Sequence, residues 1–151
     1  MISGADYISF GSRLAVFQAD EAAWRTSISR AYYGVFHHAI RFLDDRLLIS
    51  CPNSPEVHNV LKNALDFSGV MDLKRAASVL STLRTMRNKA DYQIAETKHG
   101  AQRLAMDAVE QANKAKSWVD AVDSIETLRM AQGAISANLQ LLAGLRVRNV
   151  L

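Results

Sequence analysis

A row of polar side chains recurs at helical spacing between residues 30 and 41. At about 100° per residue, its members fall within about 60° of the first one on a helix: Arg30, Tyr33, Gly34, His37 and Arg41. The apolar stripe of the same helix is centred about 140° away, so the row is expected to point away from the core. Such a row is suited to phosphate binding. The alternative interpretation is an ordinary solvent-exposed face of the helix.

Gly34 lies within this row and adds a structural indication. Glycine inside a helix costs roughly 0.5 to 1 kcal/mol relative to alanine and is tolerated where another backbone comes close. We therefore expect a partner helix on this side of the segment.

A second unusual residue is Arg87. Helical geometry places it within the apolar arc of its own segment, between Leu83 and Ala90, where a lone guanidinium is costly unless it is paired or faces a cleft. Asp91 lies one turn further on and is expected to supply the pairing. The pair then either fixes the packing of two helices or holds Arg87 toward a phosphate.

Positive charge is concentrated around this segment. Residues 72–103 carry seven Lys or Arg and three acids, a balance of +4, whereas the whole chain of 151 residues carries +3. This distribution favours an anionic ligand over a uniformly solvated surface. The candidate phosphate or RNA contacts are Arg30, Arg41, Arg84 and Lys89.

The composition predicts which elements position these residues. With 49% hydrophobic residues, 7 Gly and 2 Pro, the chain is expected to form one all-α domain with a buried core. A single Cys excludes an internal disulfide framework and a thiolate-rich zinc site and fits a cytoplasmic protein. The sequence has no apolar run long enough to span a bilayer and no leader pattern.

Caps and breakers mark the expected helices. The strongest breaker is residues 51–55, and Ser3, Asp20, Ser54, Asp72, Thr97 and Ser124 are the candidate caps. The expected helices are residues 3–19, 20–42, 54–67, 72–92 and 97–122, and a further helical stripe covers 124–143 and ends at Gly144. The spacing leaves open whether this last stripe is a separate helix. No linker divides the chain, so residues 1–122 and 123–151 are expected to be a bundle and its C-terminal extension.

Two segments together carry a resemblance to a known family. Ser29 to His37 reads S-R-A-Y-Y-G-V-F-H, a Pro-containing break and His58 follow, and Arg87 to Tyr92 reads R-N-K-A-D-Y. This pattern, over roughly residues 5–122, is similar to the prokaryotic branch of the HEPN domain family. The resemblance implies an antiparallel bundle of about five helices that is often encoded beside a nucleotidyltransferase in toxin–antitoxin or defence loci. It also implies a homodimer, whose face is then expected to include Tyr33 and Gly34.

Many members of this family are metal-independent endoribonucleases, in which an Arg is followed, after four to six residues, by a His. Arg87 matches the Arg and Asn88 the polar residue after it, but Tyr92 stands at the first His position. The resemblance therefore implies a toxin-like protein acting on RNA that lacks the motif His. The expected site is Arg87, Tyr92 and His37 as catalytic residues, with Asp91 and Asn88 orienting them.

An alternative from a different class is a non-catalytic module for dimerisation, nucleotide binding or docking of a partner nucleotidyltransferase. In this interpretation Arg87, Asp91 and Tyr92 serve helix packing, and a variant makes Tyr92 the acceptor of a nucleotidyl group. No metal or cofactor is expected, because the sequence has no metal-ligand run and no glycine-rich phosphate loop.

Overall fold

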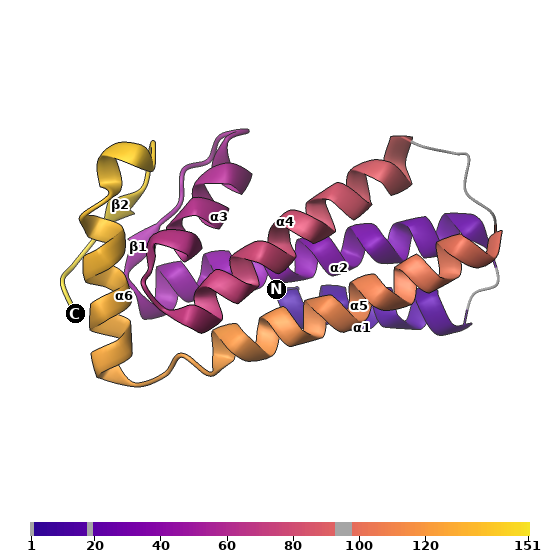
Figure 1. Ribbon diagram of the computed structural model, residues 1–151, viewed down its shortest axis with the longest axis horizontal. Coiled ribbons are helices and arrows are strands. Elements are labelled where there is room, and N and C mark those ends of the chain that lie inside the picture. The colour runs from indigo at the N-terminus through magenta and orange to yellow at the C-terminus, as the bar shows by residue number, and fades with distance from the viewer. Residues whose placement is uncertain (1, 18–19, 93–97) are drawn as a thin grey trace. The chain divides into compact units, whose positions relative to one another are not determined.

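The computed structural model describes residues 2–17, 20–92 and 98–151, and it confirms the all-α class. The described residues form six α-helices (Figure 1): α1 (Gly4–Phe17), α2 (Glu21–Arg41), α3 (Val57–Phe67), α4 (Met71–Tyr92), α5 (Lys98–Asp120) and α6 (Ile125–Ser136). Shorter elements are a π-helical turn η1 (Phe42–Arg46), a 3-10 turn η2 (Leu139–Leu141) and the two-residue strands β1 (Ile49–Ser50) and β2 (Arg146–Val147). None of the helices in the described part of the chain is long and apolar enough to cross a membrane.

Side-chain caps begin three of the helices, as the sequence predicted. The hydroxyl of Ser3 accepts a hydrogen bond from the Asp6 amide at 3.2 Å, and the Asp6 carboxylate accepts one from the Ser3 amide at 2.8 Å. Asp20 caps α2 and Ser124 caps α6 in the same way. The predicted cap Thr97 lies outside the described residues, and Asp72 lies within the first turn of α4, where it pairs with Arg75 at 3.1 Å.

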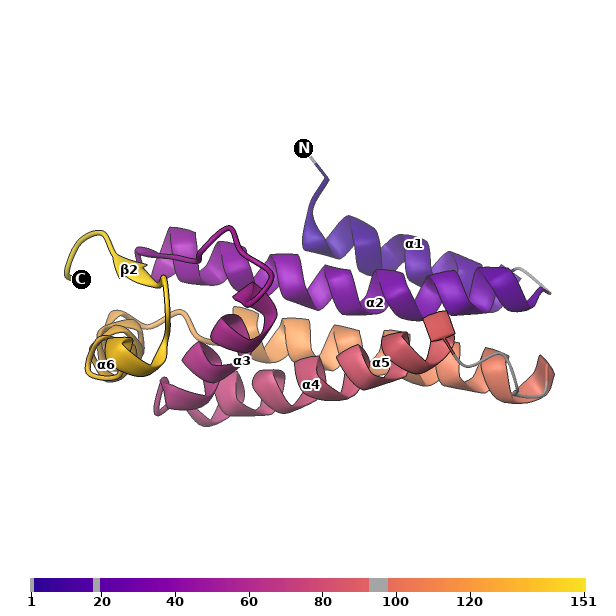
Figure 2. The same cartoon turned by 90° about the horizontal axis from the view of Figure 1, so that it is seen from above.

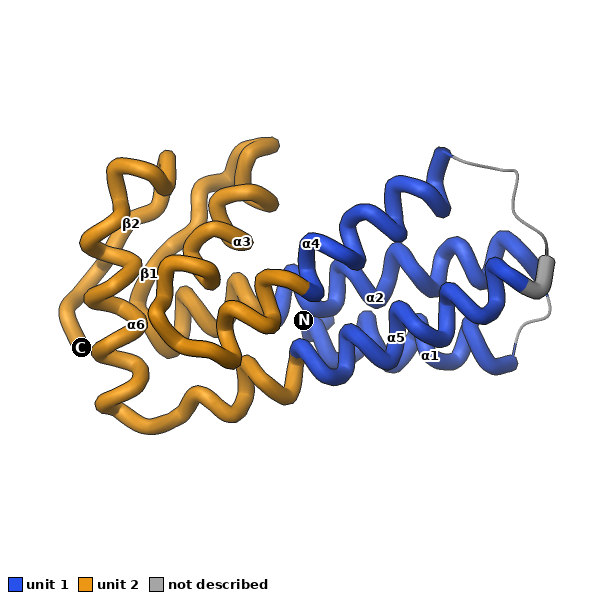
Figure 3. Tube along the Cα trace, in the orientation of Figure 1, with its two compact units in different colours: residues 1–38, 79–115 blue, residues 39–78, 116–151 orange. Residues whose placement is uncertain are grey.

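The chain divides into two compact units, which Figure 3 colours separately. Unit 1 comprises residues 1–38 and 79–115, and unit 2 comprises residues 39–78 and 116–151. The division falls within α2, α4 and α5, which contribute residues to both units. The predicted boundary between residues 122 and 123 lies within unit 2.

In unit 1, α1 lies along α2 (Figure 2), and glycines allow the close approach. A Cβ atom built on Gly34 would lie 2.4 Å from Cγ1 of Ile8 and 2.9 Å from the carbonyl oxygen of Gly4. A Cβ atom on Gly11 would lie 3.1 Å from the carbonyl oxygen of Ser27. These separations are shorter than ordinary van der Waals contacts, so this helix pair depends on glycine.

The core of unit 1 follows the predicted stripes. Its buried residues include Ile8, Ala15, Trp24, Ile28, Ala31, Tyr32, Val35, Leu80, Leu83, Ala101, Ala105, Ala108 and Ala112. The alanines of α5 are 6% exposed or less, so the predicted row of small side chains is buried, as close helix packing requires.

In unit 2, the C-terminal residues pack into the middle of the chain. Helix α6 contacts α3, and β2 pairs antiparallel with β1 in the register Ile49 with Val147 and Ser50 with Arg146. The buried amide of Gln132 donates hydrogen bonds to the carbonyls of Leu47 and Asn149, each at 2.7 Å. Residues 123–151 are therefore an integral part of unit 2.

The structure also shows whether the last helical stripe is a separate helix, a question that the spacing left open. Helix α6 is separate from α5, and it ends at Ser136 rather than at the predicted Ala143. Near its end, Ser136 and Asn138 donate side-chain hydrogen bonds to the carbonyls of Gln132 and Ala134, which competes with continued helix. Turn η2 follows, and Gly144 adopts a φ of 83°.

Candidate functional site

Three members of the predicted polar row of α2, Arg30, Gly34 and His37, lie against α1 of the same chain. The guanidinium carbon of Arg30 is 5.6 Å from the ring centroid of Tyr7, and the ring of His37 stacks on the same tyrosine with centroids 5.5 Å apart. The close neighbour of Gly34 is also α1. The partner helix that the missing side chain of Gly34 admits is therefore intramolecular, and the close contacts of Gly34 do not require a second subunit.

Arg30 is half-buried in this packing. Its Nε atom is buried and has no hydrogen-bond partner within the described residues. The positive charge of its guanidinium is stabilised by the face of the Tyr7 ring.

Arg87 lies at the centre of the candidate site, held from two directions. Its Nε donates a hydrogen bond to Oδ2 of Asp91 at 3.2 Å, so the predicted ion pair is present. Its guanidinium carbon lies 4.9 Å from the ring centroid of Tyr33 and 5.6 Å from that of Tyr32. The Arg87 side chain is 24% exposed. It is therefore neither fully buried in its ion pair nor fully exposed to solvent.

The rest of the guanidinium is available for a ligand. Hydrogen bonding within the described chain uses Nε of Arg87 and neither of its terminal nitrogens. The carboxylate of Asp91 and the two rings fix the plane of the guanidinium. The N–H groups of its two terminal nitrogens stay available as hydrogen-bond donors. An oriented guanidinium with open terminal donors is suited to a phosphate or carboxylate oxygen.

Aromatic rings connect Arg87 to the polar row of α2. The ring centroids of Tyr33 and His37 are 6.1 Å apart, and those of Tyr32 and Tyr33 are 5.3 Å apart. Phe36 contacts the same rings, with its centroid 5.2 Å from that of His37. His37 and Arg87 therefore belong to one cluster, with the Tyr33 ring between them.

Burial changes the acid–base properties of two residues in this cluster. It raises the pKa of Tyr32 to about 12, against the opposing positive charges of Arg84 and Arg87. It lowers the pKa of His37 below its ordinary value of 6.5. The imidazole is accordingly neutral at pH 7 and able to accept a proton.

The remaining predicted site residues are distributed differently. Arg84 is half-buried beside Tyr32, and Asn88 and Lys89 are exposed on α4. The side chain of Tyr92 is 80% exposed at the end of α4. Arg41 belongs to unit 2, where it pairs with Asp45 at 3.8 Å.

Two supporting residues were missed by the sequence reasoning. Tyr32 was assigned neither to the apolar stripe nor to the polar row of α2. Its position next to Tyr33 in the S-R-A-Y-Y segment could have indicated that it belongs to the site. Tyr7 carried no signal, because its role depends on how α1 packs against Arg30 and His37.

Groups for other chemistry are poorly placed. No cluster of three or more His, Cys, Asp or Glu side chains that could hold a metal occurs in the part of the chain that the structure describes. Burial, together with the negative charge of Asp44, raises the pKa of the Cys51 thiol to about 11, which keeps the thiol protonated and weakly nucleophilic at pH 7.

Fold and site together define an all-α protein that presents an arginine fixed over two tyrosine rings. Comparison with family models, with curated proteins and with solved structures gave no match. The function is therefore argued from the residues and their geometry.

Proposed function

We propose that this chain is a HEPN-like protein that binds RNA through a phosphate contact at Arg87. The observation that carries the proposal is the geometry of this guanidinium, which Asp91 holds through Nε and Tyr33 holds by stacking, while its terminal nitrogens have no partner in the described chain. A pre-oriented guanidinium loses less conformational freedom when it binds an oxyanion than a mobile one does.

Charge and sequence support this proposal. The Arg84 side chain lies close enough to Tyr32 for its positive charge to affect the pKa of that phenol, and Lys89 is exposed on the same helix. The segments S-R-A-Y-Y and R-N-K-A-D-Y are similar to HEPN motifs. We extend the proposal accordingly to a toxin-like component of a prokaryotic toxin–antitoxin or defence module, acting as a homodimer with a nucleotidyltransferase partner.

The test is a titration of the protein with a labelled single-stranded RNA at several salt concentrations. Replacing Arg87 by Met is expected to weaken binding roughly tenfold and to reduce the salt slope by about one. Arg103→Met is the matched control, because Arg103 is an exposed arginine of α5, and it is expected to bind RNA nearly as the wild type does.

Asp91→Asn separates orientation from charge. This substitution keeps the shape of the side chain but weakens the hydrogen bond that it accepts from Nε of Arg87. It is therefore expected to lower RNA affinity even though it removes a negative charge. Equal RNA affinity of Arg87→Met and Arg103→Met would contradict the proposal. It would favour the non-catalytic alternative in which Arg87 and Asp91 serve packing.

A second candidate function, metal-independent cleavage of RNA, is favoured by the position of His37. This histidine is neutral at pH 7, and one aromatic ring separates it from Arg87. Cleavage would proceed by attack of the ribose 2′-hydroxyl on the adjacent phosphorus, with His37 accepting the hydroxyl proton and Arg87 stabilising the negative charge. As the P–O2′ bond forms, the P–O5′ bond breaks, which leaves a 2′,3′-cyclic phosphate and a 5′-hydroxyl that takes its proton from water.

Cleavage of RNA in the presence of a chelator tests this second candidate. The wild type is expected to cleave, and His37→Ala and Arg87→Ala are expected to lose most of the activity, since one general base contributes about 10²- to 10⁴-fold. Cleavage retained in both variants would remove the roles assigned to these residues.

A further inference from the structure

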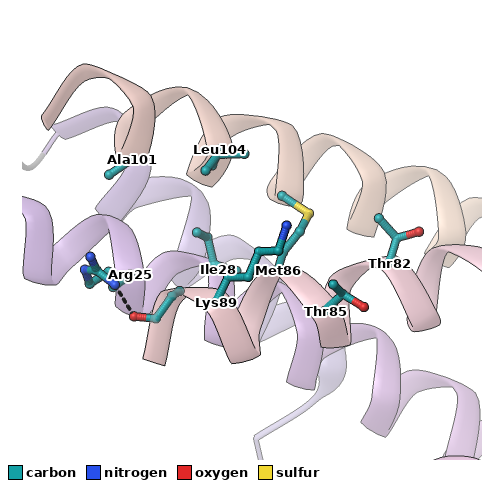
Figure 4. A pocket seen from close by; sticks show the side chains of 9 residues that line it. Arg25, Ile28, Thr82, Thr85, Met86, Lys89, Ala101 and Leu104 are labelled. Atoms are coloured by element: carbon teal, nitrogen blue, oxygen red, sulfur yellow. Dashed lines mark hydrogen bonds between the residues drawn. The ribbon is translucent and has the colours of Figure 1, made fainter. Parts of the chain in front are cut away.

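A cavity of about 340 Å³ opens in unit 1 between α2, α4 and α5 (Figure 4). Its volume is at the lower end of the range of small-molecule sites, about 300 to 1,000 Å³. Helix α2 contributes Arg25 and Ile28, and α5 contributes Ala101 and Leu104. The largest share comes from α4, which contributes Thr82, Thr85, Met86, Lys89 and Ala90.

The lining is divided between apolar and polar parts. Ile28 and Ala101 are buried, at 3% and 6% exposure, and Met86 and Leu104 are half-buried. By contrast, Thr85 and Lys89 are exposed. The cavity therefore has an apolar interior and a polar opening, which suits a ligand with one apolar and one polar end.

The two cations of the lining differ in their availability. The guanidinium of Arg25 is held by the carboxylate of Glu21 at 2.6 Å and donates a further hydrogen bond to the carbonyl oxygen of Ala90. Lys89 forms no ion pair with any described residue. A ligand anion would therefore meet the ammonium group of Lys89 rather than the neutralised Arg25.

We propose that this cavity binds a small amphipathic carboxylate, with its hydrocarbon chain against Ile28 and Leu104 and its carboxylate at Lys89. Burial of the chain supplies about 25 cal/mol per Å² of apolar surface removed from water, and the carboxylate stays at the solvated opening, where its desolvation cost is small.

The cavity is distinct from the site at Arg87. At about 100° per residue, Lys89 and Arg87 lie about 160° apart around α4. Arg87 packs on Tyr32 and Tyr33, whereas Lys89 lines the cavity. The inference therefore does not rest on the proposed RNA contact, and failure of one leaves the other standing.

Calorimetric titration of the full chain with decanoate, below its micellar concentration, tests the proposal. The wild type is expected to bind decanoate at one site and to bind decanol at least about fivefold more weakly. Lys89→Met should weaken decanoate binding about fivefold, as expected for a partly exposed charge pair. Lys74→Met, at an exposed lysine of the same helix, should leave it unchanged.

Thr85→Trp tests the location, because the indole placed at the exposed opening obstructs the cavity without a substitution in the core. Decanoate binding is expected to be lost in this variant and kept in Lys74→Trp, which places the same bulk at an exposed position about three turns away along α4. Circular dichroism of each variant checks that the helices are intact. Arg87→Met is expected to bind decanoate normally.

Three results would overturn the proposal. Absence of decanoate binding to the wild type would exclude this ligand class, and unchanged binding to Thr85→Trp would exclude the cavity as its site. Equal affinity for decanol and decanoate, together with no effect of Lys89→Met, would exclude recognition of the carboxylate.

Discussion

At the scale of single residues, the candidate site consists of a charged group and the side chains that restrict it. Asp91 and the Tyr33 ring hold Arg87 by different interactions, a charged hydrogen bond and a cation–π contact. The first fixes one edge of the guanidinium and the second fixes its plane. The result is an arginine whose open edge has a defined direction before any ligand arrives.

His37 gives a prediction about pH at the same scale. Its folded-state pKa lies below the ordinary 6.5 because of burial, so the unfolded chain binds a proton more readily. The folding free energy that depends on neutral His37 is therefore fully present above pH 6.5 and is lost as the pH falls below it. Denaturant midpoints between pH 5 and 8 should fall less on acidification in His37→Phe than in the wild type.

This comparison isolates His37 because both proteins share every other titrating group. Phenylalanine retains a ring for stacking on Tyr7 and Tyr33 but carries no titrating nitrogen. Parallel pH profiles of the two proteins would show that the imidazole is not desolvated by the fold.

At the scale of elements, the pairing of α1 with α2 decides what the polar row can do. Arg30 and His37 stack on Tyr7 of α1, and Gly34 admits the backbone of that helix at Gly4. These three residues would face solvent on an isolated helix, and in the protein they form a contact between two helices. Arg87, from α4, then meets the aromatic side chains of α2 beside it.

Substitution of two glycines tests this pairing. Gly34→Ala is expected to destabilise the protein by about 1 to 3 kcal/mol, because the new methyl group overlaps Ile8 and the backbone of Gly4. Gly133→Ala is the control, since a Cβ atom there has nothing within 4 Å, and it is expected to stabilise by about 0.5 to 1 kcal/mol.

Chemical denaturation followed by circular dichroism measures both changes. The loss in the double variant Ile8→Ala with Gly34→Ala should be smaller than the sum of the two single losses, because Ile8 Cγ1 is the nearest atom to the new methyl group. A Gly34→Ala variant as stable as the wild type would show that α1 does not approach α2 so closely.

At the scale of the whole molecule, segments that are far apart in the sequence pack against each other. Residues 123–151 look like an appendage in sequence, yet they supply β2, the contact of α6 with α3, and the Gln132 amide that binds the Leu47 carbonyl. Unit 2 is assembled from two distant stretches of sequence, and neither stretch has its full set of partners without the other.

Removal of residues 123–151 is therefore expected to disrupt the remainder of unit 2 rather than leave an intact bundle. The Leu47 carbonyl loses its buried partner, and α3 loses its contact with α6. Amide protons of α3 should exchange at least about 100-fold faster in the truncated chain. Hydrogen exchange with mass spectrometry measures this, and unchanged protection would restore the boundary at residue 122.

The sequence by itself determined the local features of this protein. Periodicity and composition predicted the all-α class and the buried alanine row of α5, and cap residues such as Ser3 and Ser124 marked helix starts. The Arg87 and Asp91 pairing was also predictable, because residues four apart on a helix are neighbours. These features depend on interactions over one or two turns, which spacing alone specifies.

Only the tertiary structure decided which helix covers which face. The spacing of residues identifies a face of a helix but not the segment that packs against it. Gly34 was therefore expected to contact a second subunit, although α1 of the same chain lies on that side. The rings over which Arg87 lies and the cavity beside Lys89 likewise arise where distant segments meet. Such contacts depend on the packing of whole helices, and no local pattern in the chain records them.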